Sequence, residues 1–122
     1  MYKYNWKSPR LGGMWAYHCI DVPFVFDNLD IPFALDADNG DRTTNPESRA
    51  KADVANKRFA LAEKTLAAWV AFARTGNPSN STTGEWPAYT LERRATMVFD
   101  KECGVVDDPR SEFRRRVTSL PT

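Results

Sequence analysis

The stretch Gly12–Asp30, GGMWAYHCIDVPFVFDNLD, is the part of the chain around which we expect the other residues to be arranged. It holds the only histidine, His18, with two glycines before it and the carboxylate of Asp21 three residues later. An apolar run follows, and Pro23 within it argues against a central β-strand. We therefore predict a loop that leads into a short buried segment. Four aromatic residues should pack this loop onto the rest of the chain: Trp15, Tyr17, Phe24 and Phe26.

Before this stretch, residues 2–6 alternate large aromatic and polar side chains. Period two predicts a β-strand with one aromatic face, formed by Tyr2, Tyr4 and Trp6. Ser8-Pro9 is expected to end the strand, and the two glycines that follow to form a turn. Because the strand starts at the first residues, we expect its aromatic face to lack a cover.

After this stretch, one long helix is predicted from Ser48 to Thr75, since apolar residues recur there at helical spacing. These apolar residues occupy more than one side of the helix, so the helix should be buried on much of its surface. The sequence Gly76-Asn77-Pro78 supplies the glycine and proline that end it. Residues 36–49 are polar and are the expected exposed, mobile connection. The expected apolar positions are Phe59, Leu61, Ala62, Leu66, Ala68, Trp69, Val70, Phe72 and Ala73.

The sequence of the last part of the chain predicts a second strand and a surface helix. Arg94 to Phe99 has the composition of a strand. Asp107-Asp108-Pro109 offers acidic caps and a first-turn proline for a polar helix over 109–117. Phe113 and Val117 are its only sizeable apolar residues, so it should lie on the surface.

Length and charge limit the classes of function. The chain has 122 residues, which suits a single domain over 1–122, and its formal net charge is +1. A near-neutral chain does not favour nucleic acid or an anionic membrane as a partner. No apolar run reaches membrane-spanning length, so the expected location is cytoplasmic.

The two cysteines, Cys19 and Cys103, are far apart in sequence. Two cysteines do not make a disulfide scaffold, and free thiols are the expectation. The ligand spacings of a zinc site are absent, and we predict neither a metal nor another cofactor.

A histidine on a glycine-led loop beside a carboxylate suits a general base, although a lone histidine also suits a structural or surface position. The surrounding sequence favours the first interpretation. Residues 13–26, G-x-x-x-x-H-x-x-D-V-P-F-V-F, resemble the catalytic-histidine loop of the type-B carboxylesterases. Ala67–Pro78 resembles the long C-terminal helix of that family and its glycine stop. Trp86–Tyr89 and Arg94–Asp100 resemble the family's last strand and its approach.

The resemblance implies an α/β-hydrolase fold and a serine-hydrolase site. This family uses a serine in a G-x-S-x-G elbow, an acid and a histidine, in that order along the chain. His18 matches the catalytic histidine, which takes the serine proton and delivers it to the leaving alcohol. Asp21 matches a carboxylate that supports the loop, and Gly13 opens the motif. The resemblance implies no cofactor.

The sequence departs from the family by lacking the other parts of the site. None of its serines stands in a G-x-S-x-G frame, and no glycine-rich oxyanion segment or upstream acid is present. The expected fold is therefore the C-terminal part of an α/β-hydrolase: one long buried helix, two or so short strands and a short surface helix. A base without a nucleophile or an oxyanion hole does not catalyse acyl transfer, so we expect this chain alone to be inactive.

Three interpretations follow. The first is a segment of a type-B carboxylesterase that needs an N-terminal esterase portion, and acts on an ester only when completed. The second is a free-standing, non-catalytic binding or assembly module derived from such a tail. The third is a small hydrolase in which Cys19, placed where the family carries a small residue, is the nucleophile beside His18. Because uncovered apolar surface favours association, the first two also predict a homo-oligomer, with a symmetric dimer expected.

Overall fold

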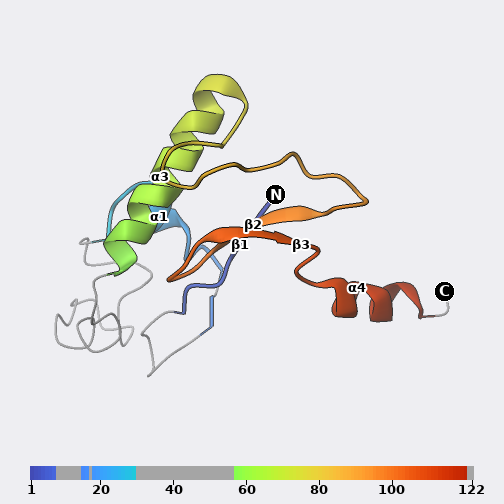
Figure 1. The fold of residues 1–122 in the computed structure, drawn as a ribbon. Coiled ribbons are helices and arrows are strands. Elements are labelled where there is room, and N and C mark those ends of the chain that lie inside the picture. Colours follow the sequence, from blue (N-terminus) through green and yellow to red (C-terminus); the bar gives the residue numbers. More distant parts are fainter. Residues whose placement is uncertain (8–14, 17, 30–56, 121–122) are drawn as a thin grey trace.

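A computed structural model of the chain describes residues 1–7, 15–16, 18–29 and 57–120 (Figure 1). These residues form a three-stranded sheet in the order β1-β2-β3, with β1 parallel to β2 and β3 antiparallel to it. The predicted turn at Gly12-Gly13, the connection over 36–49 and the helix start at Ser48 lie outside the described residues. The elements are β1 (Tyr2–Tyr4), α1 (Val22–Val25), α3 (Lys57–Thr75), β2 (Ala95–Phe99), β3 (Gly104–Asp107) and α4 (Ser111–Thr118).

The two predicted strands are confirmed as β1 and β2, and β3 was not predicted. Its four residues contain only two apolar side chains, Val105 and Val106, and one of them is exposed. This is too short a run to show a period-two pattern. Pairing with β2, from Ala95 opposite Asp107 to Val98 opposite Gly104, is what holds it in the sheet.

The aromatic face of β1 is covered from within the chain, so the expectation that it lacks a cover is wrong. Tyr2 and Tyr4 each lie within 6 Å of the Phe99 ring, at 5.8 and 5.5 Å between ring centroids. Phe24 of α1 packs on both Tyr4 and Trp6, at 5.4 and 5.9 Å. Phe24 and Phe99 are fully buried. Helix α1 and strand β2 therefore supply the cover, which local sequence periodicity does not reveal.

Helix α1 forms the short buried segment into which the loop was predicted to lead. It is a single turn with Pro23 in its first turn, where a proline costs no hydrogen bond. Only its inward residues are buried, whereas Trp15 and Phe26 are 78% and 67% exposed. The prediction that these two pack the loop is therefore wrong. Tyr17, the fourth aromatic residue, lies outside the described part of the chain.

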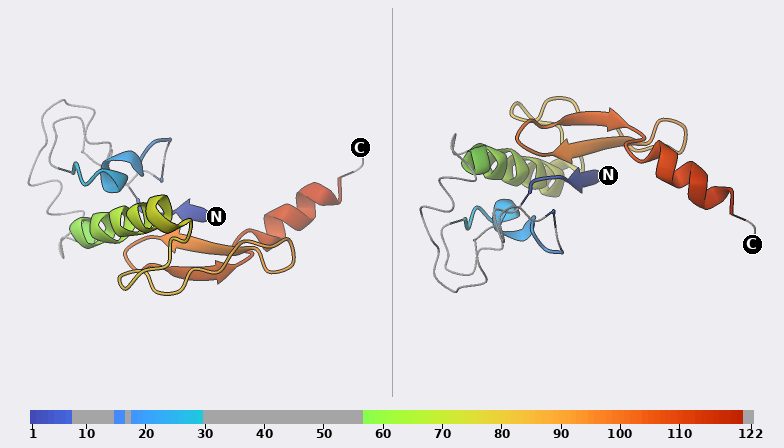
Figure 2. Two further views of the ribbon diagram at one scale, coloured as in Figure 1. Left: turned by 90° about the horizontal axis from the view of Figure 1, so that it is seen from above. Right: turned by 90° about the horizontal axis from the view of Figure 1, so that it is seen from below.

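Helix α3 buries one face only, which corrects the prediction of a helix buried on much of its surface. Leu61, Ala62, Thr65 and Ala68 are buried, and the helix packs against α1 (Figure 2). The apolar residues on its other sides are exposed, among them Trp69 at 45% and Phe72 at 56%. The described chain offers only a small sheet and one helical turn as partners, so a second face stays uncovered.

The C-terminal end of α3 is confirmed at Thr75. Gly76 follows with φ of +75°, the left-handed conformation that glycine adopts without steric cost, and its N–H donates to the Phe72 carbonyl at 2.7 Å. The chain then returns across the molecule through a loop in which Trp86, 8% exposed, packs edge-on against Phe99.

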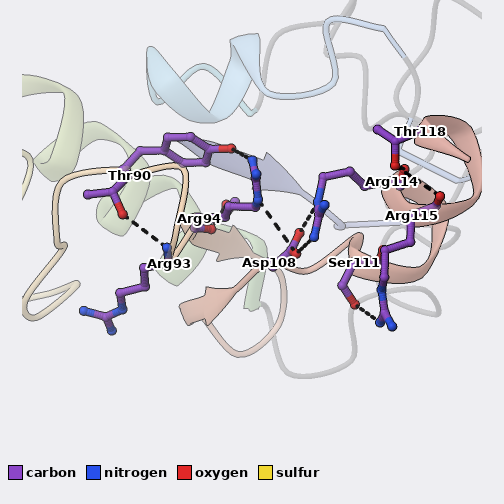
Figure 3. Close-up of polar contacts among 10 residues, drawn as sticks. Thr90, Arg93, Arg94, Asp108, Ser111, Arg114, Arg115 and Thr118 are labelled. Atoms are coloured by element: carbon purple, nitrogen blue, oxygen red, sulfur yellow. Dashed lines mark hydrogen bonds and ion pairs between the residues drawn. The ribbon is translucent and has the colours of Figure 1, made fainter.

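Helix α4 lies on the surface, as predicted, and projects away from the end of β3 in the views of Figures 1 and 2. It starts at Ser111, and the predicted acidic capping is wrong because no side chain caps it. The carboxylate of Asp108 instead binds the guanidinium groups of Arg94 and Arg114, as Figure 3 shows. Its hydrogen bond with Arg114 holds the pKa of Asp108 below its usual range.

Candidate active site

The turn that carries His18 runs directly into α1. The Cys19 carbonyl accepts a hydrogen bond from the Val22 N–H at 3.2 Å. The Asp21 carbonyl accepts from the N–H groups of Phe24 and Val25, at 3.0 and 2.9 Å. Because Phe24 is fully buried, these bonds fix the turn to the aromatic core. The resulting site is a surface turn held on the buried aromatic core.

Cys19 adopts a left-handed backbone conformation, with φ of +64°. A residue other than glycine, asparagine or aspartate is strained there, at a cost of about 1–2 kcal/mol. The thiol is half-buried and is not part of a disulfide.

Cys19→Gly should stabilise the chain by about 0.5–1 kcal/mol, because glycine relieves the positive φ but gains entropy when the chain unfolds. Urea unfolding followed by tryptophan fluorescence measures the change. Cys19→Ala is the matched control, since it removes the thiol and keeps the Cβ atom. Equal stabilisation by both substitutions would assign the effect to the thiol and contradict the backbone explanation.

A side-chain hydrogen bond ties the His18 turn to β1. The Tyr2 hydroxyl donates to the Asp21 carboxylate at 2.9 Å. The Tyr2 ring is held in turn by Phe99 and by Trp69 of α3, at 5.8 and 6.3 Å between centroids. Sequence analysis placed Tyr2 on the aromatic face of the strand but gave no sign of this bond, which joins residues 19 positions apart. Asp21 is thus bonded to the sheet, and its supporting role stays a prediction.

The pKa of Tyr2 is raised to about 12, chiefly by burial and further by the hydrogen bond to Asp21 and its negative charge. Burial raises the pKa of Tyr4 still further. Both phenols hold their protons more tightly in the folded chain than in the unfolded chain. Their contribution to stability is therefore complete below the unfolded value of about 10 and is lost as pH rises through the folded values.

In Tyr2→Phe, the free energy of unfolding should fall less steeply between about pH 10 and pH 12 than in the wild type. The variant has no phenol to ionise at that position. The urea midpoint measured at intervals across this range tests it. Tyr4→Phe is the comparison, and its effect should extend to higher pH. A wild-type slope in this range that Tyr2→Phe leaves unchanged would contradict the raised pKa of Tyr2.

His18 itself is exposed. Among the described residues, no hydrogen bond or ion pair links His18 to another side chain, the Cys19 thiol and the described serines included. Gly13 lies outside the described residues. No group of three or more His, Cys, Asp and Glu side chains in the described part of the chain is arranged to hold a metal ion. The described turn therefore carries an exposed imidazole and, three residues later, a carboxylate that accepts a hydrogen bond from the Tyr2 hydroxyl.

Comparison with known proteins gives one consistent set of relatives. The chain is 34% identical over 117 residues to the para-nitrobenzyl esterase of Bacillus subtilis (strain 168), covering 96% of this chain and 21% of that protein. It is 32% identical over 108 residues to the phenmedipham hydrolase of Pseudarthrobacter oxydans, covering 83% of this chain and 18% of the relative. No family model matches.

Solved structures agree with these relatives. A thermophilic para-nitrobenzyl esterase matches with a TM-score of 0.71 and 35% identity, over 96% of this chain and 21% of its own. A carboxylesterase of Geobacillus stearothermophilus matches with a TM-score of 0.69 and 32% identity. The match covers 94% of this chain and 21% of the carboxylesterase. These esterases have the α/β-hydrolase fold, and the helices and small sheet described above are consistent with a fragment of it.

The chain spans about a fifth of the length of the curated relatives it matches. No helix among the described residues combines the length and apolar character needed to cross a membrane.

Proposed function

Because this chain is homologous to a segment of the type-B carboxylesterases over nearly its whole length, we propose that it is the C-terminal segment of a carboxylic ester hydrolase and that His18 is its catalytic histidine. The observation that carries the proposal is the relation to para-nitrobenzyl esterase at 34% identity over 96% of the chain. The exposed turn supports it, since an imidazole that completes a site with residues outside this segment has to be accessible.

In the proposed mechanism, the unprotonated His18 imidazole accepts the hydroxyl proton of a serine as that serine attacks the ester carbonyl. The tetrahedral intermediate collapses when the imidazolium donates the proton to the leaving alcohol. The same imidazole then activates water to hydrolyse the acyl-serine. The serine, the triad acid and the oxyanion hole would come from the complementary esterase portion, and this chain alone is expected to have no esterase activity.

The local structure favours this role through positioning. A general base works only when its ring is held within hydrogen-bond distance of the proton it takes. The His18 turn is fixed on one side by the backbone bonds into α1 and on the other by the bond between Tyr2 and Asp21. We assign Asp21 and Tyr2 as positioning residues, which act through the turn and do not contact the ester.

Two other candidate functions are separated by the same experiment. The uncovered face of α3, with Trp69 and Phe72 exposed, favours a free-standing assembly module that self-associates. The pair of His18 and Cys19 is the basis of a thiol hydrolase, in which the chain alone would hydrolyse an ester and Cys19→Ala would abolish the activity. The assembly module predicts no ester hydrolysis under any condition. The thiol hydrolase predicts ester hydrolysis by this chain without a partner.

The test is complementation with the portion of Bacillus subtilis para-nitrobenzyl esterase that precedes the matched segment, co-expressed with this chain. Hydrolysis of a chromogenic carboxylic ester is measured for each polypeptide alone and for the two together. The proposal predicts activity only for the two together. Activity that is equal with and without this chain, or absent from the bound pair, would overturn it.

A further inference from the structure

A basic pocket lies where β1, β2 and the start of α4 meet. It has a volume of about 350 Å³ and is open to solvent. Its lining includes four cationic side chains and one carboxylate, which belong to Lys3, Arg94, Arg110, Arg114 and Asp108. Among the described residues that line it, Asp108 is the only acid. A hollow lined mainly by charges of one sign concentrates ions of the opposite sign.

The topology explains why these cations gather. Arg94 and Asp108 lie one position beyond the last pair of the β2–β3 ladder, and the Asp108 N–H donates to the Arg94 carbonyl at 3.3 Å. Helix α4 then starts at Ser111 and returns Arg114 to Asp108, as Figure 3 shows. Lys3 comes from β1, which pairs with the other side of β2. Segments that are distant along the chain therefore contribute the cations of the basic pocket.

The carboxylate of Asp108 cannot neutralise the basic pocket. It is already hydrogen-bonded to the Arg114 guanidinium, and its Oδ2 lies 3.9 Å from Arg94 Nε. The side chains of Lys3 and Arg110 have no ion pair or hydrogen bond with any described residue. The pocket thus holds two cations without a counter-ion and two that share one. An added anion would balance this excess of positive charge.

The start of α4 adds to the positive potential of the basic pocket. Arg110 occupies the N-cap position, and no side chain caps the helix. A cation at this end of a helix is unfavourable, because the helix dipole is positive there. An anion at the same end is stabilised by the dipole and by backbone N–H groups that have no partner within the helix. An anion beside Arg110 would therefore interact favourably with both the side chain and the helix.

Tyr89 gives the basic pocket a neutral donor. Its hydroxyl oxygen accepts a hydrogen bond from Arg94 Nη1 at 3.2 Å, and no described residue accepts one from its hydroxyl hydrogen. That hydrogen remains available to a ligand. Guanidinium groups bind the oxygens of phosphate in pairs, and a phosphate dianion carries the second charge that a carboxylate lacks. The volume falls within the ~300–1,000 Å³ typical of small-molecule sites, so a small organic group attached to the phosphate also fits.

We propose that the pocket formed by Lys3, Tyr89, Arg94, Arg110 and Arg114 binds a phosphate dianion, either free or carried by a small phosphate monoester. The ligand is bound and not transformed. None of the described residues that line the basic pocket belongs to the turn that carries His18. The proposal therefore does not rest on the proposed function, and each can fail without the other.

The first experiment is a titration of the 122-residue chain with inorganic phosphate, followed by amide NMR shifts at about pH 8, where phosphate is a dianion, and at constant ionic strength. Saturable shifts are expected at Lys3, Tyr89 and Arg110, with a Kd of about 1 mM or lower. Acetate, a monoanion, should bind about tenfold more weakly or worse. Shifts that do not saturate, or equal Kd values for acetate and phosphate, would overturn the proposal.

The second experiment compares two arginines of the same region. Arg110→Gln should raise the Kd for phosphate about tenfold or more, the loss of one charge-assisted hydrogen bond. Arg115→Gln is the matched control, because it removes the same charge from α4 at a position that does not line the basic pocket, and its Kd should stay within about twofold of the wild-type value. Equal effects of the two substitutions, or none from Arg110→Gln, would contradict the site.

A second variant keeps the test independent of α4. Lys3→Gln alters β1, and it should also weaken phosphate binding about tenfold. The amide spectrum of each variant without phosphate checks that it folds as the wild type does. Glycerol 1-phosphate then separates the two sources of the ligand: a Kd about tenfold below that of inorganic phosphate assigns the site to a monoester, and an equal or higher Kd assigns it to free phosphate. Wild-type affinity in Lys3→Gln would overturn the proposed site.

Discussion

His18→Ala should lower the kcat of the complemented esterase by about a thousandfold or more, the loss seen when one member of a serine-hydrolase triad is removed. The chain has one histidine, so no other imidazole within it can substitute. The side chain is exposed and has no described partner, so its removal should leave the fold of the segment intact. The effect should therefore lie in kcat, with binding of the complementary portion unchanged.

Two controls make this result specific. Asn28→Ala truncates another exposed polar side chain after the same helical turn and should leave kcat unchanged. Added imidazole should restore part of the activity to His18→Ala, because a diffusible base can fill the space left by the missing ring. An activity that is indifferent to His18→Ala would show that the base comes from elsewhere.

Phe99→Ala should destabilise the chain by about 3–5 kcal/mol, the usual cost of removing a buried phenylalanine ring. Phe99 is fully buried and packs against Tyr2, Tyr4 and Trp86, with centroids 5.5 to 5.9 Å away. The substitution would remove the one ring that joins β1, β2 and the loop after α3. A small domain has little stability in reserve, so the variant should be largely unfolded at room temperature.

Phe113→Ala is the matched control, because Phe113 of α4 is 64% exposed. Its effect should stay within about 0.5 kcal/mol, as for most surface substitutions. Urea unfolding measured by circular dichroism gives both values. Similar effects of the two substitutions would contradict an aromatic core centred on β2.

The parts of the fold that sequence predicted are those with a strong local signal. Strand β1 has alternating aromatic residues, β2 an apolar run, and the end of α3 a glycine followed by a proline. The cover over Tyr4 could not be predicted in this way, because it comes from Phe24 and Phe99, which are distant along the chain. The exposed face of α3 was predicted as buried, since a pattern of apolar residues does not show whether a partner is present.

The site was predicted to a similar extent. The pattern around His18 located the turn through its resemblance to a family, and the relation to that family is confirmed. The catalytic role of His18 stays a prediction. The strained conformation of Cys19 and the bond from Tyr2 to Asp21 needed coordinates, because one depends on a backbone angle and the other on a contact across the fold.

The central claim is that this segment supplies the imidazole that activates a serine in the complementary portion of an esterase. The most direct test is the rate at which a fluorophosphonate labels the serine of the complementary para-nitrobenzyl esterase portion, measured with saturating wild-type chain and with saturating His18→Ala chain. We predict fast labelling with the wild-type chain and slow labelling, equal to that of the portion alone, with His18→Ala. Equal labelling rates with the two chains would contradict the claim.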